Sequence, residues 1–166
     1  MNPRWVGGAV ALGVFLADQA AKLAVLASFA GSAGRSTPLA PFLDLALRYN
    51  RGISFSLFVQ NSAVGRAALL GFTAAAVALL VWWLSTCRSR LVAAGLGAII
   101  GGALGNAFDR VLRGGVVDYL DLHIFDRHLF VFNAADAAIN IGVALLVVDL
   151  VFGPARTGAS PQKVEK

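Results

Sequence analysis

Charged side chains are scarce in this chain. Only 14% of its 166 residues are Asp, Glu, Lys or Arg, against about a quarter in an ordinary soluble domain. Hydrophobic residues make up 58% of the chain, and the mean hydropathy is +0.73. This composition argues against a soluble domain and predicts a small integral membrane protein with one compact domain.

Residues that bind metals or form disulfides are also rare. The single cysteine, Cys87, cannot form a disulfide within the chain. His123 and His128 lie near Asp121 and Asp126, but these residues form no metal-ligand motif. Phosphate-binding and dinucleotide-binding loops are absent. We therefore expect neither metal nor cofactor. The net charge of +5 is scattered between apolar runs, which argues against nucleic-acid binding.

Apolar runs long enough to cross a membrane are the main feature that is present. The predicted fold is an all-α bundle of four transmembrane helices, at roughly residues 5–27, 67–86, 91–110 and 134–152. They form one domain, residues 1–153, followed by a flexible tail at 154–166. Asp18 and Lys22 interrupt the first run and no cleavage site follows it, so we expect a retained span rather than a removable signal peptide.

The short connection Cys87–Arg90 predicts that the second and third spans form an antiparallel pair. Lys and Arg are denser in the short segments at the two termini and in this connection than in the two long loops. This pattern predicts cytoplasmic termini and places both long loops outside the cytoplasm. In the third span, Gly97, Gly101 and Gly105 recur every four residues and predict close approach of another helix.

The first long loop carries a β pattern. Apolar residues alternate with polar ones over residues 43–50 and again over 53–59, with Arg51-Gly52 between them. Period two on both sides of a Gly-containing turn predicts a β-hairpin, or cradle, on the bundle mouth or the bilayer surface. In the second long loop we expect a short strand near Val116–Ile124.

Several charged residues lie inside or beside the spans, where charges are costly and survive by pairing or by facing the bundle interior. Asp18 and Lys22 are four apart on one helical face, as a structural ion pair or as part of a site. Asn106 and Arg110 are also four apart, and Asp109 lies next to Arg110. Asp109 and Arg110 suit a helix-end pair, whereas the forked donors of Arg110 also suit a ligand carbonyl or phosphate.

A polar stripe begins the fourth span. Asn133, Asp136 and Asn140 share one face of an otherwise apolar helix, so we expect that face to point into the bundle. A local interpretation is also open, in which Asn133 caps the helix and Asp136 at the third position completes a capping box.

Asp118, in the second loop, becomes a candidate site residue when it is considered together with Asp136. Both lie where the third and fourth spans reach the same membrane face, so their carboxylates can converge. Two close carboxylates can share one proton, and such a pair hydrolyses an amide by acid–base catalysis of water attack. Nucleophilic catalysis by Cys87, Ser54 or Ser56 fits less well, because none has a nearby His–Asp arrangement.

Five segments in order now match a known family. They are Asp18-Gln19-Ala20-Ala21-Lys22, Asn50-Arg51-Gly52-Ile53-Ser54-Phe55, the run from Gly101 to Arg110, Gly115-Val116-Val117-Asp118-Tyr119, and the run from Phe132 to Ile139. With them the chain resembles signal peptidase II, the bacterial lipoprotein signal peptidase, over everything except the tail. It departs in two places: Tyr119 stands where Phe is usual, and Leu129-Phe130-Val131 replaces a frequent Trp-Pro.

The resemblance implies a bacterial inner-membrane aspartic peptidase that removes signal peptides from diacylglyceryl-modified prolipoproteins, with its site near the extracytoplasmic face. It implies Asp118 and Asp136 as the catalytic dyad. The positions implied to support the site or contact substrate are Asp18, Lys22, Asn50, Gly52, Asn106, Asp109, Arg110, Asn133 and Ala135. Implied partners are lipidated prolipoproteins, membrane lipids and globomycin-type inhibitors, and we expect a monomer.

Two functions of other classes are alternatives to a peptidase. A small proton-coupled transporter could use Asp18, Asp109 and Asp136 as a relay. The predicted spans contain neither inverted repeats nor broken helices, which argues against that alternative. A lipid-binding structural protein would leave two convergent carboxylates unexplained.

Overall fold

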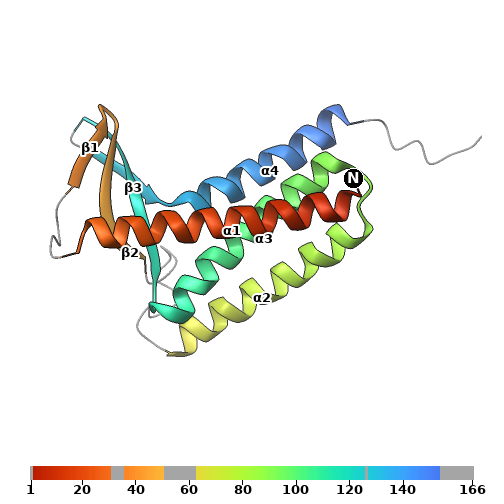
Figure 1. Ribbon diagram of the computed structural model, residues 1–166, viewed down its shortest axis with the longest axis horizontal. Coiled ribbons are helices and arrows are strands. Elements are labelled where there is room, and N and C mark those ends of the chain that lie inside the picture. Colours follow the sequence, from red (N-terminus) through yellow and green to blue (C-terminus); the bar gives the residue numbers. More distant parts are fainter. Residues whose placement is uncertain (1, 31–35, 51–62, 126, 154–166) are drawn as a thin grey trace, which may run out of the picture.

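Long helices form most of the computed structural model, which describes residues 2–30, 36–50, 63–125 and 127–153 (Figure 1). The helices are α1 (Pro3–Ser28), α2 (Ala63–Thr86), α3 (Arg90–Leu112) and α4 (Ala134–Phe152). All 4 are long and apolar enough to cross a membrane, which confirms the predicted spans. The N-terminus and the end of α4 lie at one end of the bundle, and the sheet lies at the other (Figure 1).

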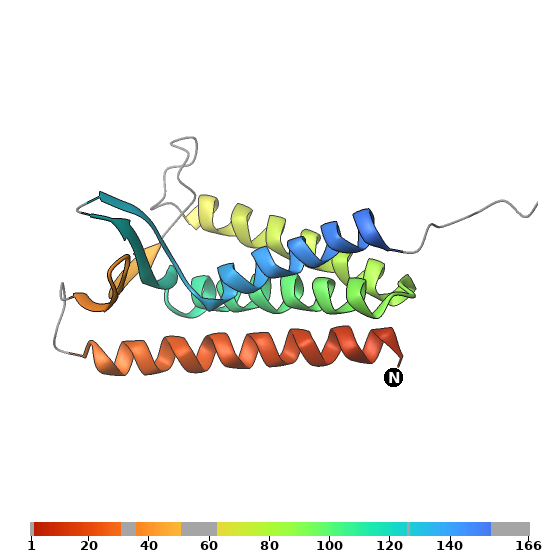
Figure 2. The same cartoon turned by 90° about the horizontal axis from the view of Figure 1, so that it is seen from above.

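Helix α3 is the centre of the bundle and lies between α1 on one side and α2 and α4 on the other (Figure 2). In its most apolar stretch 61% of the residues are buried, against 6% in α2. Glycines allow this close packing. A Cβ on Gly97 would lie 2.3 Å from the carbonyl oxygen of Gly7 in α1, and one on Gly102 would lie 2.5 Å from that of Ala135 in α4. The predicted approach of a helix to the glycine ridge is confirmed, and that helix is α1.

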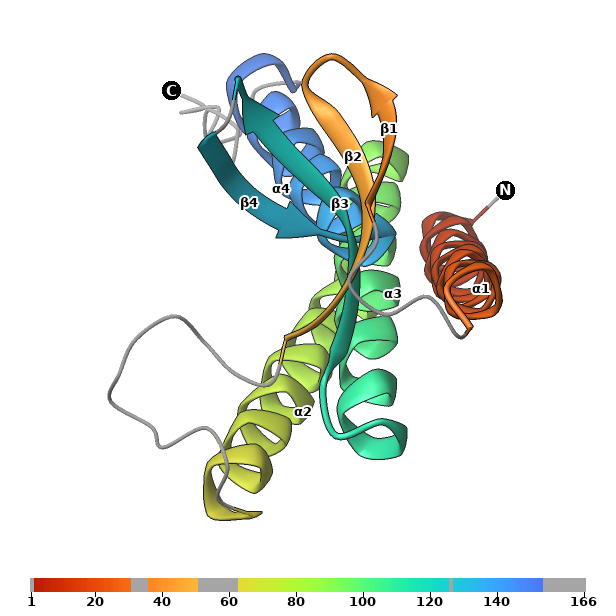
Figure 3. The ribbon, with the colours of Figure 1, turned by 90° about the vertical axis from the view of Figure 1, so that its left-hand side faces the viewer.

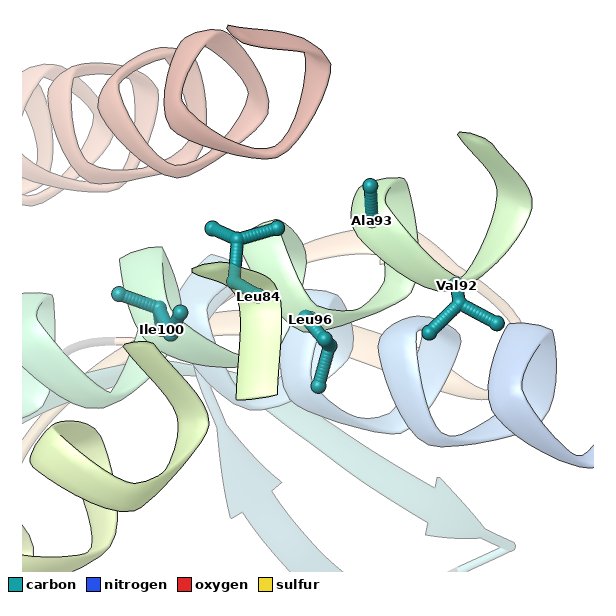
Figure 4. Packing of buried hydrophobic residues seen from close by; sticks show 5 residues of the cluster. All are labelled: Leu84, Val92, Ala93, Leu96 and Ile100. Carbon is teal, nitrogen blue, oxygen red and sulfur yellow. The ribbon is translucent and has the colours of Figure 1, made fainter. Parts of the chain in front are cut away.

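Helices α2 and α3 do form the predicted antiparallel pair, and they meet most closely near their short connection. Leu84 of α2 packs there with Val92, Ala93, Leu96 and Ile100 of α3 in a buried apolar cluster (Figure 4). This core lies at the end of the bundle away from the sheet. It anchors α2, whose remaining surface is largely exposed.

The sheet has its strands in chain order. They are β1 (Ser36–Ala40), β2 (Leu43–Asn50), β3 (Val116–Ile124) and β4 (Arg127–Phe132), and all neighbours are antiparallel (Figure 3). The strand predicted at Val116–Ile124 is confirmed. Leu43–Asn50 pairs with β1 and β3, two partners that the sequence did not predict. The predicted second arm, residues 53–59, and the turn at Gly52 lie outside the described residues.

Strand β3 docks the sheet onto the end of the bundle. It follows α3 through Gly114, whose φ of 73° lies in the left-handed region that favours glycine. Val117 and Tyr119 are buried with Val25 of α1 and with Phe29, which caps the end of that helix. Because side chains alternate along a strand, Asp118 lies on the opposite face from these apolar neighbours.

Every main-chain N–H at the start of α4 has a partner. The N–H of Asp136 donates to Oδ1 of Asn133 at 2.9 Å, and that of Asn133 donates to Oδ2 of Asp136 at 3.2 Å. The N–H of Ala134 donates to the Tyr119 hydroxyl at 3.2 Å, and that of Ala135 donates to Asp18 Oδ1 at 3.0 Å. The first donors of a helix have no partner inside it, so these bonds fix the position of the α4 start.

We expect Tyr119→Phe to lower the free energy of unfolding by about 1 kcal/mol, because it leaves the half-buried N–H of Ala134 without its acceptor. Thermal unfolding in detergent measures the loss. Tyr49→Phe is the matched control, because Tyr49 is half exposed on β2 and its loss of a hydroxyl should be neutral. Equal melting temperatures for Tyr119→Phe and the unaltered protein would contradict this role of the hydroxyl.

Candidate active site

The carboxylates of Asp118 and Asp136 are joined by a chain of two amides. Asn133 Nδ2 donates to Asp118 Oδ1 at 2.7 Å, and Asn106 Nδ2 donates to Asp136 Oδ1 at 2.8 Å. The two amides are bonded to each other, since Asn133 Nδ2 also donates to Asn106 Oδ1 at 3.1 Å. Strand β3 and helices α3 and α4 thus bring these predicted site residues into one hydrogen-bonded group.

Asp136 satisfies both interpretations that the sequence left open. With Asn133 it forms a capping box at the start of α4, through its Oδ2 atom. Its Oδ1 atom accepts the bond from Asn106. One carboxylate therefore both closes the helix and faces the polar centre, and capping fixes the rotamer in which it does so. Asn140 was expected on the same interior face, but it is exposed, so that prediction was wrong.

Asp18, Lys22 and Asp109 form a fully buried ionic cluster beside the amides. Lys22 Nζ lies 2.8 Å from Asp18 Oδ2 and 2.9 Å from Asp109 Oδ2, and all three side chains are 0% exposed. Its third bond goes to Asn106 Oδ1 at 3.1 Å. The predicted Asp18–Lys22 pair is confirmed as one part of a larger cluster that joins α1 to α3.

Asp109 has different partners from those expected. Its carboxylate pairs with Lys22 and with Arg113, one turn further along α3, rather than with Arg110. Gln19 joins the cluster by donating to Asp109 Oδ1 at 3.3 Å, and Arg113 donates to Gln19 Oε1 at 3.3 Å. Sequence reasoning missed Gln19 and Arg113. The spacing of four between residues 109 and 113 was the available signal for Arg113.

The guanidinium group of Arg110 has an unused hydrogen-bond donor. Its Nη1 donates to the carbonyl oxygen of Asn106 at 3.2 Å. Its Nε is the one buried side-chain nitrogen or oxygen without a hydrogen-bond partner in the described part of the chain. The negative charges of Asp118, Asp136 and Asp109 act on this guanidinium. A buried donor without a partner is costly, so this position suits a bound ligand with an acceptor group.

Burial raises the pKa of Asp118 above its usual range, and the negative charge of Asp136 raises it further. Side-chain hydrogen bonds from Asn50 and Asn133 act in the opposite direction. Asn50 ends β2 opposite Val116, which brings it to Asp118 as a site residue. A carboxyl whose pKa is raised can hold a proton and donate it to a ligand.

The remaining candidates lie around this centre or outside it. Ala135 is fully buried, and its N–H is held by Asp18. Gly52 lies outside the described residues. His123 bonds to Asp44 at 3.3 Å and His128 to Asp121 at 2.9 Å, both on the sheet. Among the described residues, these side chains and their neighbours do not gather into a group able to hold a metal ion.

Comparison with known proteins agrees with this geometry. Residues 10–152 match the family model of Signal peptidase (SPase) II. The chain is 49% identical over 149 residues to a lipoprotein signal peptidase of Beijerinckia indica, covering 90% of this chain and 89% of that one. It is 44% identical over 158 residues to a lipoprotein signal peptidase of Methylocella silvestris, covering 95% and 92%.

Solved structures share the fold of this chain. The fold is similar to that of a bacterial membrane enzyme determined by the in meso method at 2.3 Å resolution, with a TM-score of 0.75 and 25% identity over 96% of this chain and 94% of that one. A second bacterial membrane enzyme, determined by the same method at 1.9 Å, gives a TM-score of 0.75 and 27% identity over 89% and 94%. The chain belongs to the signal peptidase II family.

Proposed function

We propose that the chain is an aspartic endopeptidase of the bacterial inner membrane that removes signal peptides from diacylglyceryl-modified prolipoproteins, cleaving before the lipidated cysteine. The observation that carries this proposal is the amide chain that runs from Asp118 through Asn133 and Asn106 to Asp136. It aims two carboxylates into one polar site at the end of a membrane bundle. A carboxylate pair of this kind activates water without a covalent intermediate.

The two aspartates take different roles. Asp118 carries the shared proton, because burial and the charge of Asp136 raise its pKa. Asp136 takes the role of general base, and both of its oxygens accept hydrogen bonds, from Asn106 and from the N–H of Asn133. Asp136 removes a proton from the attacking water while Asp118 donates its proton to the scissile carbonyl oxygen. The proton on Asp136 then passes to the leaving amine nitrogen as the C–N bond breaks. One hydroxyl of the gem-diol returns its proton to Asp118 in the same step, which leaves a carboxyl product and restores the starting state of the pair.

Arg110 and the sheet are suited to hold the substrate. The unpaired Nε of Arg110 can donate to a substrate carbonyl beside the dyad. Phe125 is 90% exposed at the turn between β3 and β4, and Phe42 and Phe130 are also exposed on the sheet. Exposed aromatics suit a surface that rests on lipid and receives a lipidated chain. Globomycin-type inhibitors would occupy the same site, in a monomeric enzyme.

A proton-coupled transporter fits the site less well. Its relay would need Asp18, Asp109 and Asp136 to load and release protons. Asp18 and Asp109 are both bound to Lys22, at 2.8 and 2.9 Å, in a fully buried cluster, so a relay through them would have to break these ion pairs at every step.

We expect Asp136→Asn and Asp118→Asn each to lower kcat for a lipidated precursor by about 10²–10⁴-fold, because each removes one member of the acid–base pair. The double variant should be little worse than either, since the pair acts as a unit. Purified, folded variants assayed by precursor cleavage give the measurement.

Asp44→Asn is the matched control for these variants. Asp44 lies on β2, contacts His123, and stands apart from the proposed machinery, so its variant should retain activity. Asn caps a helix about as well as Asp, which separates the capping role of Asp136 from the catalytic one. Near-normal cleavage by folded Asp136→Asn or Asp118→Asn enzyme would refute the aspartic mechanism.

The pH profile should respond to Asn50. Activity requires a protonated Asp118, so it is lost as pH rises through the pKa of that group. Asn50 lowers this pKa, and Asn50→Leu therefore moves the alkaline limb of kcat/KM to higher pH, while the acid limb stays in place. Cleavage rates measured across the pH range test the shift. A limb that stays fixed or moves to lower pH would assign the proton to Asp136 instead.

Both termini should lie in the cytoplasm, with the active site at the opposite membrane face. A reporter that is active only outside the cytoplasm should be silent when fused after Lys166, because basic residues are dense near the termini. The same reporter inserted at Phe125, in the exposed turn between β3 and β4, should be active. The reverse pattern of signals would overturn this orientation.

A further inference from the structure

The residue before each dyad aspartate is held through its main-chain N–H by a buried carboxylate. The N–H of Val117 donates to Asp109 Oδ2 at 3.1 Å, and the next residue is Asp118. The N–H of Ala135 donates to Asp18 Oδ1 at 3.0 Å, and the next residue is Asp136. The two attachments are equivalent, although one is made to a strand and the other to a helix.

One ammonium group joins these two attachments. Lys22 Nζ binds Asp18 and Asp109, and its third bond is to Oδ1 of Asn106, whose Nδ2 donates to Asp136. An ammonium group has three donors, and here all three are used within the site. Lys22 also fixes which way the Asn106 amide faces, because the oxygen that meets the ammonium leaves the NH₂ group for Asp136.

We propose that Asp18, Lys22 and Asp109 form a positioning device that sets the separation and orientation of Asp118 and Asp136. Through it, the Lys22 ammonium group on α1 locks β3 and α4 in one register relative to each other. This inference rests on the proposed function of the dyad and assigns the three residues a role in it without contact with substrate.

The arrangement goes beyond what a structural ion pair requires. Asp18 and Lys22 already neutralise each other within α1, four residues apart. The cluster nevertheless includes the carboxylate of Asp109 from α3. Asp18 accepts the N–H of Ala135 through the oxygen that does not bind Lys22. Asp109 accepts the N–H of Val117 through the same oxygen that binds Lys22. Gly105 makes room for the cluster, since a Cβ there would lie 2.5 Å from Asp18 Oδ2.

Removal of the ammonium charge tests the proposal. We expect Lys22→Met to lower kcat for a diacylglyceryl-modified precursor by about 10²-fold or more, because a misplacement of about 1 Å in a catalytic group has an effect of that size. KM should change little, since Arg110 and the sheet are untouched. The limbs of the kcat pH profile should also move, because the separation of the two aspartates determines how strongly they share a proton.

Gly105→Ala is a second variant that changes no charge. Its Cβ displaces the Asp18 carboxylate and should reproduce the loss of kcat and the altered pH profile in milder form. The matched control is Gly97→Ala in the same helix, whose Cβ would lie 2.3 Å from the Gly7 carbonyl oxygen and disturbs packing alone. Ser89→Ala is a control at the far end, where it removes the 2.7 Å bond to Asp149. Both controls should lower thermal stability while the folded enzyme keeps its kcat and pH profile.

Folded Lys22→Met enzyme with normal kcat and an unchanged pH profile would overturn the proposal. If Lys22→Met does not fold, Gly105→Ala decides: a lowered kcat supports the device, and behaviour like that of Gly97→Ala refutes it. Failure of the dyad itself looks different, because Asp136→Asn would then remain active. An inactive Asp136→Asn beside a fully active Gly105→Ala would refute only the positioning role.

Discussion

Burial of the Lys22 ammonium inside an apolar bundle is the constraint on which the polar half of this structure depends. A buried charge is stable only when it is paired and its donors are satisfied. Lys22 meets that requirement with Asp18, Asp109 and Asn106, which brings α1 and α3 into contact at one level of the bundle. Gly105 of α3 leaves the space that the Asp18 carboxylate occupies, since a Cβ there would lie 2.5 Å from Asp18 Oδ2.

The same contact holds the main chain beside Asp118 and Asp136. The carboxylates that neutralise Lys22 also accept hydrogen bonds from the N–H groups of the residues before Asp118 and Asp136. Asn106, which Lys22 also binds, donates to the Asp136 carboxylate. The start of α4 is therefore fixed by tertiary bonds as well as by its own capping box. Helix α2 contributes least to this order, since most of its surface is exposed for contact with lipid.

The sequence was most informative where the physics is local. Apolar runs located the helices, and alternation located β2, because both patterns depend on near neighbours in the chain. The partner of β2 was missed because strand pairing is non-local. Strand β1 was missed because it is a short edge strand that contains Pro38, which an edge tolerates. Of the polar residues, Gln19 and Arg113 were overlooked because their partners lie on other turns and helices, and Asn140 was misplaced because α4 buries only a narrow face.

The central claim is that two aspartates held by one buried network share a proton and a water molecule. A structure of the enzyme with ordered water, determined with an inhibitor absent and then bound, measures this directly. The account predicts a water molecule within hydrogen-bond distance, about 2.6–3.2 Å, of one oxygen of Asp118 and one of Asp136, displaced by the inhibitor. Carboxylates that diverge, with no position from which one water molecule reaches both, would contradict it.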